Sequence, residues 1–286
     1  MAGESRSLTP LAETLAALVG PEIDDERIDL ARAALTIART EYPGLDPELY
    51  VSKLAELAAR VAARLPAEPE AAPTIAALNH VLFEEEGFRG NRADYYDPRN
   101  SFLNDVLDRK LGIPITLAVV YMEVARHIGF PLFGVGMPGH FLLKHYDVEG
   151  KETLIDAFHR GSILTPHQCQ QRLDEIYAGQ LPLEPGFLAT VSRRQVLTRM
   201  LNNLKGIYLG ARHLRKALPI VDLVLAIYPR SPEDVRQRAL LRHQLGQVRG
   251  AVQDLEDYLK MSPEASDADE VRQLALSLRR TLALMN

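Results

Sequence analysis

Apolar residues recur three and four positions apart between about residues 8 and 65 of the chain. This is the spacing of one face of an α-helix, so the pattern predicts a run of amphipathic helices. Asp46 followed by Pro47 indicates a helix start, because Asp caps the first turn and Pro suits its first position. The run from Leu65 to Pro73 predicts a loop, and Thr74 to Glu86 predicts a further helix.

The middle of the chain changes from a helical pattern to an alternating one. Pro114 begins an apolar helix that Gly129 ends. Alternating apolar and polar residues then predict three strands, at Leu132–Val135, His140–Tyr146 and Thr153–Phe158. The sequence therefore predicts a small antiparallel sheet beside a buried helix.

The register of the last two strands follows from the expected turn. We expect a three-residue loop, Asp147 to Glu149, with Gly150 in the left-handed conformation, which places Tyr146 opposite Gly150. Directly opposed side chains lie close together in an antiparallel pair. Counting back along both strands pairs Lys144 with Glu152, Leu142 with Leu154, and His140 with Asp156.

The last third of the chain is helical and repeats itself. Ala217 and Ala251 are 34 residues apart, and so are Pro229 and Pro263. A period of 34 with a small residue inside the second helix and a proline at its end is typical of tetratricopeptide repeats. Because such helix pairs bury their apolar faces by stacking, we expect a last helix, about Asp267 to Met285, to cap the array.

Composition and charge narrow the class of protein. The 286 residues are 47% hydrophobic and 25% charged, as in ordinary globular proteins, and are enough for two domains. The formal net charge of -5 argues against nucleic acid as a partner, since phosphate binding needs a concentrated basic surface.

Cysteine content and hydropathy bear on the compartment. Cys169 is the only cysteine, which excludes an intramolecular disulfide and a cysteine-based zinc site. The most apolar window, Ile113 to Tyr121, is too short to cross a bilayer, and the first residues lack the pattern of a secretory signal. We expect a cytoplasmic protein with no membrane partner.

The helix at Pro114 and the hairpin suggest the layout of a thiol enzyme. A Cys-His-Asp site needs a thiolate at a helix N-terminus, a His facing it and a carboxylate that orients the His ring. His140 and Asp156 supply two of these parts, but the helix begins with a proline.

These residues carry a resemblance to a known family. The run YYDPRNSFLNDVLDRKLGIPITLAVVYMEVARHIGF, followed by MPGHFLLKHY and LIDAF, resembles the SirB-type transglutaminase-like family, and the likeness covers about residues 25 to 262. It implies a papain/transglutaminase-type core, often followed by tetratricopeptide repeats. It also implies that His140 and Asp156 stand at the catalytic His and Asp positions. The family frame G-x-C matches Gly112, Ile113 and Pro114, so Pro114 occupies the nucleophile position.

The expected fold class is therefore α+β and mostly helical, a papain/transglutaminase-like core with a small antiparallel sheet followed by an α-helical tetratricopeptide-type domain. We expect the first domain to span residues 1–187, with a helical part at 1–90 and the core at 91–187. The repeats with their capping helix then occupy residues 188–286.

Other residues could replace the missing thiol. Thr116 is one candidate, but two helical residues turn by about 200°, so it faces away from His140 if Pro114 faces it. Its hydroxyl would then bond to a nearby backbone carbonyl. Cys169 lies on a different helix and matches no part of the family frame, so we interpret it as incidental unless that helix folds over the dyad.

The remaining candidates concern binding. The polar residues Asn100, Asn104, Asp108 and Arg109 lie at helical spacing and either line a groove beside the dyad or serve the turn and the solvated surface. The binding residues that we expect are Asn100, Asn104, Arg109, Pro114 and Thr116. There is no His-Glu-x-x-His motif, and His140 and His145 lie on opposite faces of one strand, so we expect no metal. No phosphate loop is present, and we expect no cofactor.

The sequence leaves two functions open, with a third behind them. We expect a non-catalytic, degenerate transglutaminase-like protein that acts as a regulator or adaptor and binds a protein or peptide partner. The alternative is an amide-bond hydrolase or acyltransferase in which the His140 and Asp156 dyad works with another nucleophile or with water. The third is a groove that binds a small metabolite. The oligomeric state is not predicted.

Overall fold

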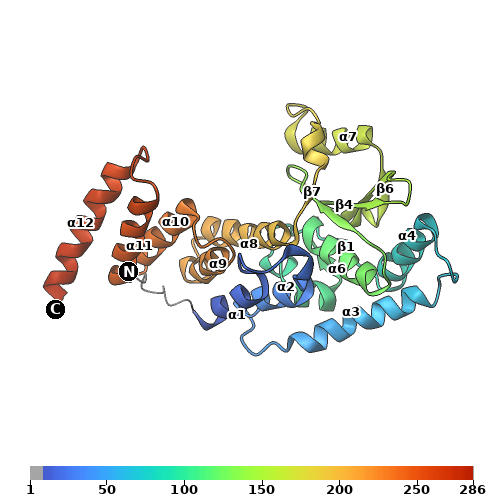
Figure 1. Ribbon diagram of the computed structural model, residues 1–286, viewed down its shortest axis with the longest axis horizontal. Coiled ribbons are helices and arrows are strands. Elements are labelled where there is room, and N and C mark those ends of the chain that lie inside the picture. The colour runs from blue at the N-terminus through green and yellow to red at the C-terminus, as the bar shows by residue number, and fades with distance from the viewer. Residues whose placement is uncertain (1–8, 286) are drawn as a thin grey trace. The chain divides into compact units, whose positions relative to one another are not determined.

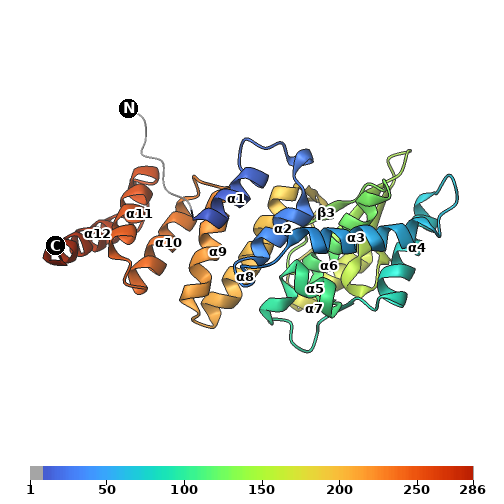
Figure 2. The ribbon, with the colours of Figure 1, turned by 90° about the horizontal axis from the view of Figure 1, so that it is seen from below.

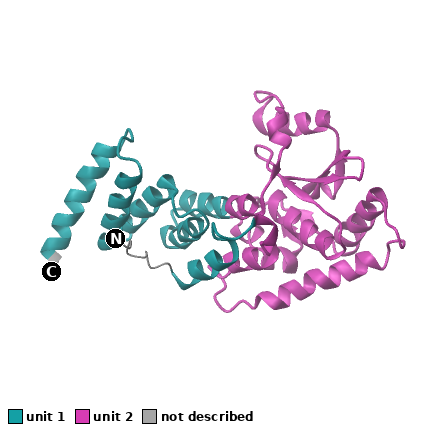
Figure 3. Cartoon of the chain, in the orientation of Figure 1, with its two compact units in different colours: residues 1–24, 201–286 teal, residues 25–200 magenta. Residues whose placement is uncertain are grey.

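The computed structural model describes residues 9–285, which form two compact units. One unit comprises residues 25–200, and the other combines residues 9–24 with 201–285 (Figure 3). The division falls inside one helix, α8 (Arg193–Gly210). The predicted boundary after residue 187 stays a prediction, and the compact units divide at a different point.

The unit of residues 25–200 contains helices around a small sheet (Figure 1). Its helices are α2 (Leu30–Ala38), α3 (Pro47–Ala62), α4 (Ala71–Asn79), α5 (Leu103–Arg109), α6 (Pro114–His127) and α7 (Pro166–Tyr177). A π-helical turn, His80–Glu85, follows α4, and short 3-10 turns lie at Asp25–Arg27, Pro98–Asn100, Ala157–His159 and Pro185–Leu188. The predicted starts at Pro47 and Pro114 are confirmed, and the side chain of Asp46 caps α3 by accepting from the Glu48 N–H at 3.0 Å.

The sheet is antiparallel and has five strands in the order β6-β5-β4-β3-β7. The strands are β3 (Phe133–Val135), β4 (Leu142–Tyr146), β5 (Glu152–Asp156), β6 (Ser162–Leu164) and β7 (Thr190–Val191). A separate parallel pair joins β1 (Arg89–Gly90) to β2 (Leu111–Gly112), directly before α6. The predicted fold class, α+β and mostly helical, is confirmed.

The two faces of the sheet pack on different helices. Side chains alternate between the faces. Leu142 and Leu154 form an apolar cluster with Cys169 and Leu173 of α7, while α6 packs against β4 and lies on the other side of it (Figure 1). Burial on both faces fixes the sheet between α6 and α7 and positions the end of β5.

The predicted register of the hairpin is wrong by two residues. Tyr146 pairs with Glu152 and not with Gly150, because the connecting loop has five residues, 147–151. The Asp147 carboxylate accepts from the backbone N–H groups of Glu149 at 3.0 Å and Lys151 at 2.8 Å, which stabilises the longer turn. Gly150 does adopt the expected positive φ, of 81°.

The other unit is entirely helical (Figure 2). Its helices are α1 (Pro10–Val19), the second half of α8, α9 (Leu214–Ile227), α10 (Pro232–Gln244), α11 (Val248–Met261) and α12 (Ala268–Met285). Consecutive helices from α9 to α12 pack on one another, and α1 packs on α9, which explains why residues 9–24 join this unit. Ala217 and Ala251 are fully buried, as the predicted repeat requires, and α12 follows them as the expected last helix.

Among residues 9–285, no helix is both long enough and apolar enough to cross a membrane.

Candidate functional site

His140 lies in a tight turn just before β4. Its backbone N–H donates to the carbonyl of Met137 at 3.1 Å, and Gly139 has a φ of 67°. A Cβ on Gly139 would lie only 2.8 Å from the side chain of Ile176, so this turn requires glycine. The guanidinium of Arg199 donates to the carbonyls of His140 at 2.6 Å and Met137 at 3.0 Å. The backbone of His140 is therefore held by the turn bond to Met137 and by the guanidinium of Arg199.

Asp156 ends β5 and uses both carboxylate oxygens. Oδ1 accepts from the backbone N–H groups of Phe158 at 3.1 Å and His159 at 3.2 Å, which caps the 3-10 turn that follows. Oδ2 accepts from Nε2 of His140 at 2.9 Å and from Nδ1 of His159 at 2.7 Å. The structure thus brings His140 and Asp156 together, by a diagonal contact and not by the predicted direct pairing.

The electrostatics of Asp156 follow from these contacts. The carboxylate is fully buried, and His140 is only 5% exposed. Burial alone raises the pKa of the Asp156 carboxyl, but hydrogen bonds from the His140 and His159 rings outweigh it, so this pKa lies well below its ordinary range. Asp156 is therefore ionised at neutral pH and holds both rings.

Phe158 packs against the dyad. Its ring lies edge-on to the His140 ring, with centroids 6.0 Å apart, and the Tyr95 ring is also edge-on to it, with centroids 6.4 Å apart. A Cβ on Gly90 would lie 2.3 Å from the Phe158 ring, so the glycine of β1 makes room for it. The aromatic ring shields His140 on this side.

The residue that the resemblance places at the nucleophile position, Pro114, offers no attacking atom. Pro114 is buried and is the first residue of α6. The Thr116 hydroxyl is fully buried and lies 2.7 Å from the Asn100 carbonyl and 3.2 Å from the Ile113 carbonyl. It also accepts from the backbone N–H of Ile113 at 3.1 Å. Thr116 thus closes the start of the helix.

Cys169 lies on α7 near Asp156. Its side chain is fully buried in the apolar cluster under the sheet. Burial, together with the nearby charge of Asp156, raises the pKa of the Cys169 thiol. A thiol in this environment is a poor nucleophile at neutral pH.

The polar residues proposed to line a groove are mainly buried. The side-chain amide of Asn100 donates to the carbonyls of Asp94 at 2.7 Å and Tyr95 at 3.2 Å. Asn104 is 5% exposed, and Arg109 binds Asp97 at 3.1 Å. These contacts fold the loop that carries Tyr95, and a contact of Asn100, Asn104 or Arg109 with a ligand stays a prediction.

One cluster could hold a metal ion. His140, Asp156 and His159 each offer a ligand atom within 4.8 Å of the others. His159 was not expected as a ligand from the sequence, although it follows Asp156 by three residues. Ligands on a tetrahedral zinc ion lie about 3.3 Å apart. The distances of 2.9 and 2.7 Å found here are those of hydrogen bonds. Arg172 also lies 3.8 Å from the carboxylate and adds positive charge, so we interpret the cluster as a hydrogen-bonded network.

Sheet, dyad and helical repeats together define a transglutaminase-like domain followed by tetratricopeptide helices. The profile of the transglutaminase-like superfamily matches residues 48–202, and the tetratricopeptide repeat profile matches residues 204–275. The chain belongs to the transglutaminase-like superfamily, and the resemblance to the SirB type is confirmed by its relatives.

Three relatives differ in sequence identity and in the share of each chain that the match covers. A UPF0162 protein of Xylella fastidiosa is 37% identical over 268 residues, which cover 93% of each chain. Protein SirB1 of Salmonella typhimurium is 25% identical over 222 residues, covering 78% of this chain and 81% of that protein. F-box only protein 21 of Mus musculus is 36% identical over 183 residues, covering 59% of this chain and 28% of that protein.

Menin is a distant match among solved structures. The chain aligns with menin at a TM-score of 0.39 and 11% identity, covering 92% of this chain and 72% of menin. We base no conclusion on a similarity of this level.

Proposed function

We propose that the protein is a cytoplasmic, non-catalytic member of its superfamily that acts as a regulator or adaptor and binds a protein or peptide partner. One observation carries the proposal: Pro114 stands where the family frame has its nucleophile. The two nearest substitutes are engaged or buried, since Thr116 bonds to the backbone and Cys169 lies in the apolar cluster. Tetratricopeptide repeats generally mediate interactions between proteins, which supports the second half of the proposal.

An amide-bond hydrolase or acyltransferase is the second candidate, favoured by the intact dyad. Asp156 binds Nε2 of His140, which leaves Nδ1 as the ring nitrogen that could take a proton from water. Such an enzyme would need no thiol at position 114.

Turnover separates the two proposals. Wild-type protein and a His140→Ala variant are assayed side by side on a panel of amide hydrolysis and transamidation substrates. The adaptor proposal expects no turnover by either protein, and a partner that co-purifies in stoichiometric amount with both. Turnover by the wild type that His140→Ala abolishes would overturn the adaptor proposal and support the second candidate.

The assignment of Pro114 to the nucleophile position can be tested by placing a cysteine there. In a Pro114→Cys variant, the new thiol would stand at the N-terminus of α6, where the helix dipole lowers its pKa. We expect it to react with iodoacetamide at neutral pH about tenfold faster than the buried Cys169 of the wild type. Adding His140→Ala should slow that reaction. Equal rates for Pro114→Cys and the wild type would show that the start of α6, where Pro114 is buried, does not activate a thiol as the family frame requires.

A further inference from the structure

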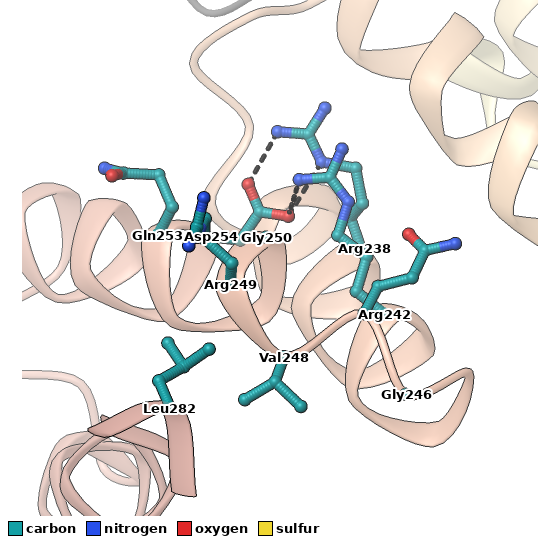
Figure 4. A pocket seen from close by; sticks show the side chains of 10 residues that line it. Arg238, Arg242, Gly246, Val248, Arg249, Gly250, Gln253, Asp254 and Leu282 are labelled. Carbon is teal, nitrogen blue, oxygen red and sulfur yellow. Dashed lines mark hydrogen bonds and ion pairs between the residues drawn. The ribbon is translucent and has the colours of Figure 1, made fainter. Parts of the chain in front are cut away.

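A second site lies in the helical unit, away from the dyad. α10, the turn after it, α11 and α12 surround a hollow of about 700 Å³ that is open to solvent (Figure 4). Arginines and Asp254 lie on one side of it, and Val248 and Leu282 lie on the other. The hollow thus has a charged side and an aliphatic side.

The charged side is held in place by buried ion pairs. Arg238, which is 5% exposed, binds Asp254 through two hydrogen bonds of 2.9 and 2.7 Å, and it binds Asp222 at 3.0 Å. Arg242 binds Asp254 at 2.7 Å. Both guanidinium groups are therefore oriented before any ligand arrives, which lowers the entropy lost on binding.

Arg242 keeps hydrogen-bond donors free for a ligand. Its second terminal nitrogen lies 3.7 Å from Asp222, beyond hydrogen-bond distance. The absence of a side chain at Gly250 lets Arg242 lie against α11, since a Cβ there would be 3.1 Å from its Cδ. Arg242 thus lines the hollow with donors that its bond to Asp254 does not use.

Charge around the hollow is not balanced. Arg238 and Arg242 are matched by Asp222 and Asp254, whereas Arg249 also lines the hollow, is exposed, and has no ion pair among residues 9–285. One positive charge remains, in a chain whose formal net charge is -5. A carboxylate placed between Arg242 and Arg249 would neutralise it and accept charge-assisted hydrogen bonds.

We propose that this hollow binds an acidic side chain of a partner peptide, with an adjacent aliphatic side chain between Val248 and Leu282. The proposal rests on the proposed adaptor function and names the chemistry of the partner. A peptide fits better than a free metabolite because the hollow is open, so a partner's main chain can stay outside while two side chains enter. Metabolite sites instead enclose most of the ligand surface.

The test uses the full chain and two synthetic probes. Acetyl-Leu-Glu-Ala-amide and its glutamine counterpart, acetyl-Leu-Gln-Ala-amide, are titrated into ¹⁵N-labelled protein. We expect the glutamate peptide to shift the amide resonances of Gly250 and Gln253, and to bind about fivefold more tightly than the glutamine peptide. Equal binding of the two peptides, or no binding of either, would overturn the proposal.

Two charge-reversal variants form a matched pair. Arg249→Glu removes the unmatched charge, and Arg280→Glu makes the same change at an exposed position of α12 outside the hollow. We expect Arg249→Glu to weaken the glutamate peptide about fivefold or more and Arg280→Glu to leave it unchanged. Equal losses in both variants would show general attraction by charge and refute a site. Sodium acetate that displaces the peptide at equal concentration would show a simple anion site without the aliphatic contact, which also refutes the proposal.

The outcome is separable from that of the adaptor function. A co-purifying partner that Arg249→Glu retains would support the adaptor function and refute this site. Turnover in the substrate panel would overturn the adaptor function while leaving the peptide titration as a measured fact about the hollow.

Discussion

Removing the carboxylate of Asp156 should destabilise the unit of residues 25–200 strongly. The carboxylate is fully buried and accepts four hydrogen bonds, two from imidazole rings and two from backbone N–H groups. Asp156→Ala leaves all four donors without this acceptor. Breaking a buried, hydrogen-bonded ion network in this way costs about 3–5 kcal/mol. For a unit of this size, that corresponds to a fall in melting temperature of roughly 6–20 °C.

Asp156→Asn should be milder, because an asparagine keeps one acceptor oxygen for the backbone N–H groups. Its amide can donate to both rings if His140 and His159 each move their proton to the other ring nitrogen. We therefore expect a loss of about 1–2 kcal/mol, from the lost charge alone. A conservative change at an exposed carboxylate, Glu149→Gln, makes the same charge change in the hairpin loop and should leave stability unchanged.

The contribution of the Asp156 carboxylate to stability depends on pH. Because the folded state holds the pKa of Asp156 below its unfolded value, this carboxylate stabilises the fold above about pH 4, and the contribution fades as pH falls towards the folded pKa. Urea unfolding followed by circular dichroism at a series of pH values measures it. The gap between wild type and Asp156→Asn should shrink as the pH falls below about 4. A loss below about 1 kcal/mol in Asp156→Ala, or a gap that does not change at low pH, would refute the reasoning.

Four further substitutions test the packing, each by its urea unfolding midpoint. Gly161→Ala would place a Cβ 1.7 Å from Oδ1 of Asn79 at a φ of 70° and should cost about 2–4 kcal/mol, whereas Gly150→Ala, with a φ of 81° and open space, should cost about 1 kcal/mol. Arg238→Ala leaves two buried aspartates without their main cation and should cost about 3–5 kcal/mol. Asp25→Ala removes the acceptor for the first backbone N–H groups of α8 and should cost about 1–2 kcal/mol. Losses that are equal for the two glycines, or within error of zero for the others, would contradict the contacts described.

Local chemistry made most helices predictable from the sequence. Proline at a first helical position identifies Pro47 and Pro114 without any tertiary information, because the missing N–H has no partner there in any case. The helical repeats can likewise be recognised from the 34-residue period in the sequence alone, since each repeat packs on its neighbour. The prediction of the hairpin register was wrong for an equally local reason, because Asp147 stabilises a longer loop than the one that Gly150 alone suggests.

Contacts between distant segments explain what the sequence could not predict. Arg199 binds the carbonyl of His140, 59 residues away, and nothing in either segment indicates it. The packing of α1 on α9 could not be predicted either, because an apolar helix face does not indicate which other helix it contacts. His159 could have been identified from the sequence. It follows the capping residue Asp156 by three positions, and a side chain at that spacing lies near the carboxylate of the cap.

The two roles of Asp156 bear on how a dyad can persist beside a proline. One oxygen caps the turn after β5, and the other holds the buried ring of His140 and the partly exposed ring of His159, so the carboxylate stabilises the fold whatever residue stands at position 114. His140 in turn is fixed through its backbone by Arg199 and through its ring by Asp156. A dyad with these contacts is expected in an enzyme and in a non-catalytic relative alike. The contacts of Asp156 therefore stabilise the fold in either case. The orientation of the His140 ring, with Nε2 on Asp156, favours the enzyme, and the proline at position 114 favours the adaptor, so the turnover assay tests one observation against the other.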